Sequence, residues 1–598
     1  MELNDILKVG EICEVSGRVV KAGVYSEKNT EYLNYNGTIV KNISIGSYVL
    51  IRKGFSNIIG RVEGEFMKEE LSEPFKQLNK RNSVNRIVGI GILGALENDK
   101  FVHGVTNLPM IGNYVYVVTE DVISGIFSKN AKDKITLGTL IAYEEYPFEV
   151  NVQDLLCSHI GIFGNTGSGK SNTLAKLYRE VVEKYKINKN FNQNAKFVII
   201  DFNGEYSKVF DNANIYKLST RTRRNKNKYP ISYEDIFDGE FWSIILEATD
   251  KTQKPFIDRC IRKYKNLIDG MDNYDRNSLC DIIYNSNEKI VDCRSYLKEI
   301  FYLLEIQEQF SPIEEKLMYN YKNKSFFLRN DMSDRYAPTK KEIFELAFGT
   351  EENENFNLEN LNDFEKFKLV LYWNYCAEIG KAYITKEHIG PLMARANNRI
   401  DSLSKIFEVN NKEDEDKSNV DVISLVGLRV DMRKIIPLII CKKLYSNKKE
   451  SKKNSLNSSL HIIVDEAHNI LSNTSIRESS EWKDYRLECF EEIIKEGRKF
   501  GTFLTIASQR PSDISDTIIS QLHNYFIHRL VNEEDLRKIY RTIAFSDKST
   551  NEMIPILPAG GCVFAGLASN FPVLARISIL PDENQPQSEN IDIRKIWY

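Results

Sequence analysis

The residues best suited to chemistry lie in the glycine-rich segment Gly164 to Ser171, which reads GNTGSGKS. It fits the pattern GxxxxGK[ST] and stands between the apolar run IGIF and a helical pattern. Glycines let consecutive backbone N–H groups turn toward phosphates, and the amino end of the next helix adds a positive dipole. A glycine-rich turn that matches by chance is the alternative, but the flanking strand and helix favour ATP binding. The predicted nucleotide ligands are Gly164, Asn165, Thr166, Gly167, Ser168, Gly169, Lys170, Ser171 and Asn172.

Two of these side chains have distinct roles. Lys170 would neutralise phosphate charge, and the Ser171 hydroxyl would bind Mg²⁺.

A second motif, LHIIVDEAH, is an apolar strand that ends in Asp465 and Glu466. Asp465 would hold Mg²⁺ directly or through water, and Glu466 would act as general base on the attacking water. An Asp-Glu pair at a strand end is often only a solvated helix cap, but its pairing with the glycine segment favours catalysis.

Three further polar residues follow predicted strands or helices. Asp201 ends the run KFVIID and either supports the metal and water or forms an Asx turn. Gln509 follows the strand FLTIAS and can hydrogen-bond the γ-phosphate or the lytic water. Arg498, in IIKEGRKFG, could stabilise phosphoryl charge in a neighbouring subunit, or could complement a helix dipole before Gly501.

The composition indicates the general class of protein but does not identify a binding partner. Apolar residues make up 42% and charged residues 28% of 598 residues, and Lys+Arg 81 against Asp+Glu 84 leaves a formal net charge of −3. This profile is typical of a soluble globular protein with several domains, and overall charge says nothing about nucleic acid. The scattered cysteines show no metal-ligand spacing. No run approaches the ~20 apolar residues that span a bilayer, so we expect a cytoplasmic protein without membrane contact.

The pattern of the chain changes twice. From Val9 to about Thr119, short alternating runs broken by Gly and Asn turns are typical of a small β-barrel. From Ile160 onward, alternating strands and helices indicate an α/β core with a parallel sheet, interrupted by amphipathic helices. The predicted segments are a barrel at 1–150, the first part of the ATPase core at 151–236, a mostly helical insertion at 237–409, and the second part of the core with the C-terminal tail at 410–598.

Taken together, five segments resemble the HerA family in order and wording: GNTGSGKS, DFNGEY, VDEAHN, EGRKFG and ASQRPSDI. That family belongs with FtsK among hexameric RecA-like motor ATPases. The likeness extends to the first domain, to FWSIILEATDKTQKPFIDRCI, and to LPAGGCVFAGLASNFPVLARI near the end. It therefore covers nearly the whole chain.

The resemblance implies an α/β fold: a RecA-like P-loop ATPase core with a mostly parallel sheet, an N-terminal β-barrel and a helical insertion. It implies a homo-hexamer with double-stranded DNA in its pore and with ATP and Mg²⁺ at subunit interfaces. The arginine that completes each site would be Arg498 of a neighbour, with Arg529 in FIHRLVNEEDL as a second candidate. The residues carried over to the nucleotide are Lys170, Ser171, Asp201, Asp465, Glu466 and Gln509.

Family members work beside a separate nuclease, of the NurA type, in DNA end processing, or beside a nuclease or sirtuin-like effector in antiphage defence. This chain carries no nuclease or NAD-binding signature, so a partner would do any cutting. The leading hypothesis is a DNA translocase, and the alternative is an ATP-regulated ring scaffold. A conjugation-type export motor is disfavoured because no membrane segment is apparent. The choice between repair and defence stays open at this point.

Five basic residues lie close together after the second core strand. They could line a pore and track phosphates, although a charge run is more often a solvated loop. The run comprises Arg221, Arg223, Arg224, Lys226 and Lys228.

Overall fold

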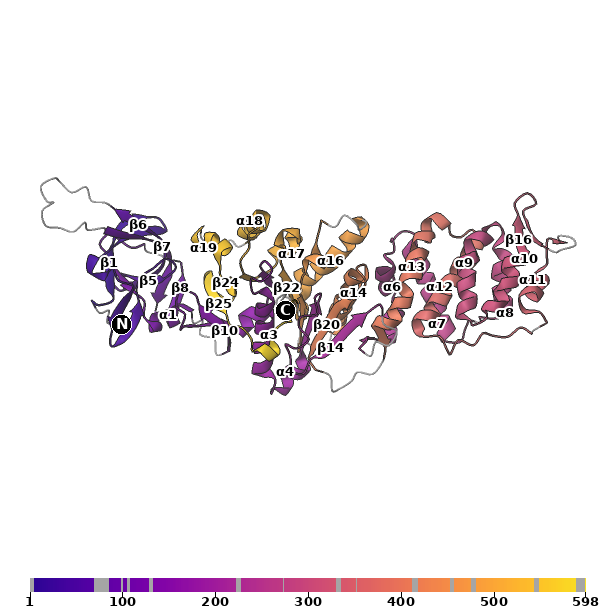
Figure 1. Cartoon of the computed structure of the whole chain (residues 1–598), viewed down its shortest axis with the longest axis horizontal. Coiled ribbons are helices and arrows are strands. Elements are labelled where there is room, and N and C mark those ends of the chain that lie inside the picture. Colours follow the sequence, from indigo (N-terminus) through magenta and orange to yellow (C-terminus); the bar gives the residue numbers. More distant parts are fainter. Residues whose placement is uncertain are drawn as a thin grey trace.

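The structure is a computed structural model of an elongated molecule. A barrel lies at one end, a large sheet covered by helices lies in the middle, and a helical region forms the other end (Figure 1). Of the basic run, Arg223, Arg224 and Lys226 lie outside the described residues. The described residues are 5–68, 85–97, 100–104, 108–127, 133–221, 227–272, 274–329, 335–350, 352–410, 418–451, 457–474, 480–542, 548–587 and 597.

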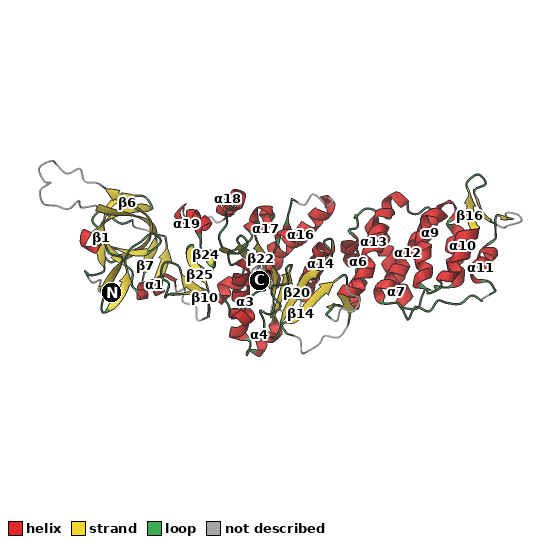
Figure 2. Ribbon diagram, viewed as in Figure 1, coloured by secondary structure: helices red, strands yellow, loops and turns green. Residues whose placement is uncertain are grey.

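Six antiparallel strands close the N-terminal barrel in the order β1–β9–β5–β6–β7–β2, because β2 pairs with both β7 and β1 (Figure 2). Alternation along each strand places Val9, Val20, Ile51 and Ile90 inside. Its strands are β1 (Lys8–Ser16), β2 (Val19–Val24), β5 (Tyr48–Lys53), β6 (Ser56–Lys68), β7 (Asn85–Glu97) and β9 (Tyr114–Val117). Smaller elements around it are β3 (Tyr32–Tyr35), β4 (Thr38–Lys41), β8 (Lys100–His103) and α1 (Glu120–Phe127).

The central sheet has the order β11-β10-β25-β24-β23-β12-β22-β21-β13-β20-β14. From β23 to β14 all neighbours are parallel, and the pairs from β23 to β11 are antiparallel. Its first strands are β10 (Lys134–Leu140), β11 (Pro147–Asn151), β12 (Ile160–Phe163), β13 (Ala195–Asp201) and β14 (Asn214–Ser219). The others are β20 (Val420–Gly427), β21 (Ser459–Val464), β22 (Thr502–Ser508), β23 (Asn524–Ile527), β24 (Gly561–Gly566) and β25 (Val573–Ile577).

Helices cover both faces of this sheet, which explains why its strands are apolar throughout. Residues of α3 (Lys170–Tyr185) pack with Ile199 and Val422 on one face. Residues of α14 (Met432–Ser451) and α16 (Ser480–Glu496) belong to the other core, with Val198 and Ile462. The predicted α/β core with a mostly parallel sheet is therefore confirmed, as are the barrel and the helical insertion.

The insertion leaves the core between two short parallel strands, β15 (Tyr229–Ile231) and β19 (Phe407–Val409). Its central helix, α12 (Asp363–Gly380), is buried on nearly all sides. Trp242 stacks on Phe367 with ring centroids 3.7 Å apart. The other helices are α5 (Tyr233–Ile236), α6 (Gly239–Leu246), α7 (Gln253–Ile268), α8 (Arg276–Asn285), α9 (Ile290–Leu303), α10 (Ser311–Lys316), α11 (Lys340–Phe348) and α13 (Lys386–Ile406). A small sheet, β16 (Leu317–Asn320), β17 (Ser325–Leu328) and β18 (Arg335–Tyr336), ends this region.

Strands β10 and β11 belong to the large sheet, although the sequence assigned residues up to 150 to the barrel domain. Alternation alone could not separate them, since a barrel strand and an antiparallel edge strand share the same period. The segment boundaries at 150, 236 and 409 stay predictions. Among the described residues, no helix is long and apolar enough to cross a membrane.

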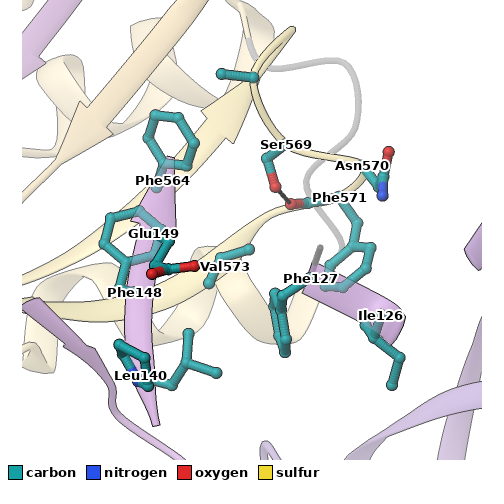
Figure 3. A pocket seen from close by; sticks show the side chains of 12 residues that line it. Ile126, Phe127, Leu140, Phe148, Glu149, Phe564, Ser569, Asn570, Phe571 and Val573 are labelled. Carbon is teal, nitrogen blue, oxygen red and sulfur yellow. Dashed lines mark hydrogen bonds between the residues drawn. The ribbon is translucent and has the colours of Figure 1, made fainter. Parts of the chain in front are cut away.

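A wedge of aromatic rings joins the barrel to the core. Phe571, between β24 and β25, lies 5.6 Å from Tyr48 and from Phe127 and 5.4 Å from Phe101, measured between ring centroids. Figure 3 shows Phe571 beside Phe127 at one side of a small pocket, with Glu149 of β11 at another side. The cavity measures 20 Å³, about the size of one water molecule. The tip of this core hairpin thus packs on the barrel, beside hydrogen bonds such as that from Arg61 Nη1 to the Thr550 hydroxyl at 2.8 Å.

Phe571→Ala should loosen this joint. Phe571 is 5% exposed, and removing a buried phenyl ring costs about 3 to 5 kcal/mol. We expect faster amide hydrogen exchange in β5 and α1, measured on the full chain. The matched control is Phe55→Ala in a barrel turn, where the ring is 105% exposed and nothing should change. Equal exchange in the two variants would contradict the wedge.

Candidate nucleotide site

The loop between β12 and α3 needs glycine at three positions. A Cβ on Gly164 would lie 2.6 Å from Cβ of His528, and one on Gly169 would lie 3.0 Å from Cα of Gly560. Gly167 and Gly169 also have φ angles of 73° and 107°, in the region that favours glycine. Helix α3 begins at Lys170 directly after the loop, so its free N–H groups face the loop. The backbone here is shaped as a phosphate cradle.

A buried histidine supports this cradle from below. His528 donates from Nδ1 to the carbonyl of Gly561 at 2.9 Å, so its Nε2 accepts from the Thr173 hydroxyl at 2.9 Å. Beside it, the Gly560 N–H donates to the Ser168 carbonyl at 2.9 Å. Burial lowers the pKa of His528 to about 4, and the charge of Lys170 adds to this, against the effect of its backbone bonds. No local sequence pattern predicts this role for His528, because its partners come from distant segments.

Lys170 forms the centre of a buried ion cluster. Its Nζ lies 2.9 Å from Asp465 Oδ1 and 3.1 Å from Glu466 Oε1, and all three side chains are buried. Burial alone would lower the pKa of Lys170, but the attraction of the two carboxylates raises it above its ordinary value. Glu466 has a φ of 46°, a costly conformation for a residue with a side chain. The chain thus bears local strain at the predicted general base.

Gln509 connects this cluster to the phosphate loop. Its Nε2 donates to Glu466 Oε1 at 2.5 Å, and its Oε1 accepts from the Thr166 hydroxyl at 2.5 Å. The connection exists because β22, which ends just before Gln509, lies between the loop strand β12 and the acidic strand β21. His468, which was not among the predicted residues, places Nδ1 3.3 Å from Glu466 Oε2. The predicted loop, base and sensing amide therefore lie together.

The same cluster fits a magnesium ion. One ammonium faces two carboxylates, and Asp465 Oδ2 is buried without a hydrogen-bond partner among the described residues. The Ser171 hydroxyl lies beside Glu205 and Tyr206 and affects the pKa of both. Mg²⁺ prefers carboxylate and hydroxyl oxygens together with phosphates. An uncompensated carboxylate oxygen next to a phosphate cradle supplies that chemistry.

Asp201 and Asn172 are placed differently from the other predicted ligands. Both oxygens of Asp201 accept backbone N–H groups, from Gly204 at 2.7 Å, Glu205 at 3.1 Å and Tyr206 at 3.0 Å. The structure thus realises the turn alternative, and burial raises the pKa of Asp201 despite these bonds. Asn172 donates to the carbonyl of Ser578 at 3.1 Å and accepts from Leu580 N at 3.3 Å, which ties down the chain after β25. Contact of either residue with nucleotide stays a prediction.

The two arginine candidates lie at opposite ends of the parallel strands: Arg498 before the start of β22, and Arg529 after the end of β23. Arg498 precedes β22, and its Nη1 lies 3.0 Å from Nε2 of His523, whose backbone N–H bonds to the carbonyl of His159 just before β12. The phosphate loop follows the other end of β12, so Arg498 cannot reach it within one chain. Arg529 lies beside the loop, where its carbonyl accepts the Asn165 N–H at 2.9 Å. Arg498 could therefore meet a phosphate loop only in a second copy of the chain, and its role stays a prediction.

An open groove of about 570 Å³ adjoins the loop on its exposed side. Its wall combines Thr166 and Gln509 with one cation, Arg510, and with carboxylates that include Asp513 and Glu534. The groove therefore lies beside Thr166 and Gln509, while the side chains of Lys170, Asp465 and Glu466 stay buried. A site built in this way can receive a group from outside the chain.

The fold and this set of residues together define a P-loop ATPase. A match to the family described as "Helicase HerA, central domain" covers residues 135–363. A probable helicase of Methanocaldococcus jannaschii is 23% identical over 572 residues, which is 94% of this chain and 91% of the relative. The DNA double-strand break repair helicase HerA of Sulfurisphaera tokodaii is 23% identical over 91% of this chain and 90% of its own length.

The enzyme of the same name from Pyrococcus furiosus is 22% identical over 90% of this chain and 88% of its own length. Among solved structures, VirB4 of Thermoanaerobacter pseudethanolicus is 14% identical with a TM-score of 0.39, covering 76% of this chain and 98% of that one. Along nearly its whole length, this chain is thus similar to helicases of the HerA type.

Because of His528, which supports the phosphate loop, the free energy of unfolding should depend on pH. The pKa of His528 is about 4 in the folded chain, against about 6.5 for an unfolded histidine, so folding favours the neutral ring. Its contribution is complete above about pH 6.5 and is lost as the pH falls toward 4, on the order of 3 kcal/mol in all. The variant His528→Gln keeps a hydrogen-bond donor and an acceptor but does not titrate. Its free energy of unfolding, measured with urea, should decrease less than that of the wild type as the pH falls over this range.

The matched control is His388→Gln on the exposed side of α13. It should follow the wild-type pH dependence. Parallel curves for wild type and both variants would show that His528 does not titrate in this way.

Proposed function

We propose that this chain is an ATP-driven DNA motor that works as a ring of six copies, with each active site completed by a neighbour. The observation that carries the proposal is the gathering of Lys170, Asp465, Glu466 and Gln509 around the phosphate loop. Arg498 lies at the end of the strands away from the phosphate loop, which supports a ring in which it serves a neighbouring subunit.

In this proposal the loop amides and Lys170 hold the β- and γ-phosphates of ATP. Ser171 and Asp465 would hold Mg²⁺, which would neutralise phosphate charge. Glu466 accepts a proton from water, whose oxygen bonds to the γ-phosphorus as the bond to the β–γ bridging oxygen breaks. ADP and inorganic phosphate result. Gln509, held by Glu466 and Thr166, orients the water and senses whether the γ-phosphate is present.

The arginine of the second subunit would stabilise the charge that develops on the transferring phosphoryl group. We assign this role to Arg498, because it is exposed and lies far from its own loop. Arg529 remains the second candidate, although it lies beside its own loop. In a head-to-tail ring, one surface of each subunit meets a different surface of the next. Such a contact can bring Arg498 of one subunit to the phosphate loop of its neighbour.

Double-stranded DNA is the proposed track, supported by relatives that are named as DNA double-strand break repair helicases. The proposed partner is a separate nuclease of the NurA type, or a nuclease or sirtuin-like effector in antiphage defence. The barrel offers a surface for such a protein, since exposed apolar residues gather next to one turn, where Lys53 Nζ bonds to the Leu108 carbonyl at 2.7 Å. These residues are Phe55, Leu108, Met110 and Ile111.

The same surface favours the second candidate, a ring scaffold whose ATP cycle controls assembly of an effector without movement along DNA. Both candidates need the ATPase site. They differ in whether duplex DNA changes the rate of hydrolysis.

ATP hydrolysis measured with and without duplex DNA tests the proposal. We expect duplex DNA to raise the rate, and Glu466→Gln to lower it by about 10² to 10⁴ because the general base is lost. The matched control is Glu488→Gln on the exposed side of α16, which should behave as wild type. Full activity of Glu466→Gln would refute the site. Hydrolysis that needs Glu466 but ignores duplex DNA would favour the scaffold.

A further inference from the structure

The small sheet at the end of the insertion has one covered and one uncovered face. Its register pairs Leu317 with Leu328 and Tyr319 with Phe326. These side chains point inward and pack on the main core. Met318, Phe327 and Tyr336 also pair across the strands, and alternation puts them on the opposite face. That face lies at the end of the molecule farthest from the barrel (Figure 1).

Aromatic rings dominate the uncovered face. Phe327 and Tyr336 stack with their centroids 5.7 Å apart and an interplanar angle of 30°. Neither belongs to the core clusters; Phe327 is half-buried, and Tyr336 is 52% exposed. At the adjoining turn, Tyr321 is exposed as well and packs edge-on against Tyr319. Flat apolar rings are thus available to a partner.

Cations flank these rings. The Arg329 N–H donates to the carbonyl of Lys316 at 2.9 Å, which continues the pairing of β16 with β17 by one residue. Lys316, the last residue of α10, and Arg329, directly after β17, therefore flank the end of the strand pair two residues from Met318 and Phe327. Lys322 and Lys324 lie in the exposed turn between the strands. Within the described part of the chain, none of these four cations is in an ion pair, whereas Glu314 on α10 faces Lys298.

We propose that this face binds single-stranded nucleic acid, with bases stacked on Phe327 and Tyr336 and phosphates held by Lys316 and Arg329. Stacking requires exposed base faces, which a single strand offers and an intact duplex does not. The flanking cations match a phosphate backbone, and the exposed rings are too few for a stable protein interface. The site is independent of ATP hydrolysis and lies on a different part of the chain from the nucleotide loop.

Binding of a fluorescently labelled thymidine oligonucleotide of about 12 nucleotides, followed by anisotropy on the full chain, tests the proposal. The double variant Phe327→Ala/Tyr336→Ala should bind at least about 10-fold more weakly, because the bases lose both rings on which they stack. Lys316→Gln/Arg329→Gln should weaken binding and reduce its salt dependence by about two phosphate contacts. Tyr336→Phe keeps the ring and should bind as wild type.

The matched control is Tyr383→Ala, an exposed tyrosine between α12 and α13. It should leave binding unchanged. Lys170→Ala should also bind as wild type, so that failure of the proposed ATPase and failure of this site give different results. A uridine oligonucleotide of equal length distinguishes RNA from DNA, and binding of either supports the site.

Crosslinking gives a direct readout. An iodouridine-substituted oligonucleotide should crosslink to the segment that carries Phe327 or Tyr336, identified by mass spectrometry. Equal affinity of wild type and Phe327→Ala/Tyr336→Ala, or crosslinks confined to other segments, would overturn the proposal.

Discussion

The buried cluster of Lys170, Asp465 and Glu466 is the constraint on which the rest of the core depends. Two buried carboxylates repel each other, so the ammonium of Lys170 must lie at hydrogen-bond distance from both of them. That requires the end of β12 and the end of β21 to lie at the same edge of one sheet, with β22 between them. Parallel pairing of these strands provides this arrangement, and helices on both faces exclude water from it. The strained Glu466 and the bridging Gln509 follow from the same geometry.

One hairpin contacts both this site and the barrel. Gly560 and Gly561, at the start of β24, bond to Ser168 in the loop and to His528 below it. At the other end of the hairpin, Phe571 lies among the rings of Tyr48, Phe101 and Phe127. The strand between these contacts is β24, six residues long.

Much of this could be predicted from the sequence, where the signal is local. The glycine pattern, the apolar strand before Asp465 and the amphipathic helices of the insertion each predicted their own structure. What the sequence missed depends on contacts between distant segments. His528 supports the loop through Thr173 and Gly561, and no local pattern marks such a role. For Asp201 the local pattern was visible but ambiguous, because an aspartate after a strand can serve a metal or form a turn. In the structure it forms the turn.

The central claim is that the active site is completed by a second copy of the chain. Mixing two inactive proteins, Lys170→Ala and Arg498→Ala, tests it most directly. In a mixed ring, an intact phosphate loop of one variant meets the intact Arg498 of the other. We predict that ATP hydrolysis returns to about a quarter of the wild-type rate in an equal mixture, since about one interface in four is then complete. A mixture as inactive as its components, although each assembles, or full activity of Arg498→Ala alone, would contradict the account.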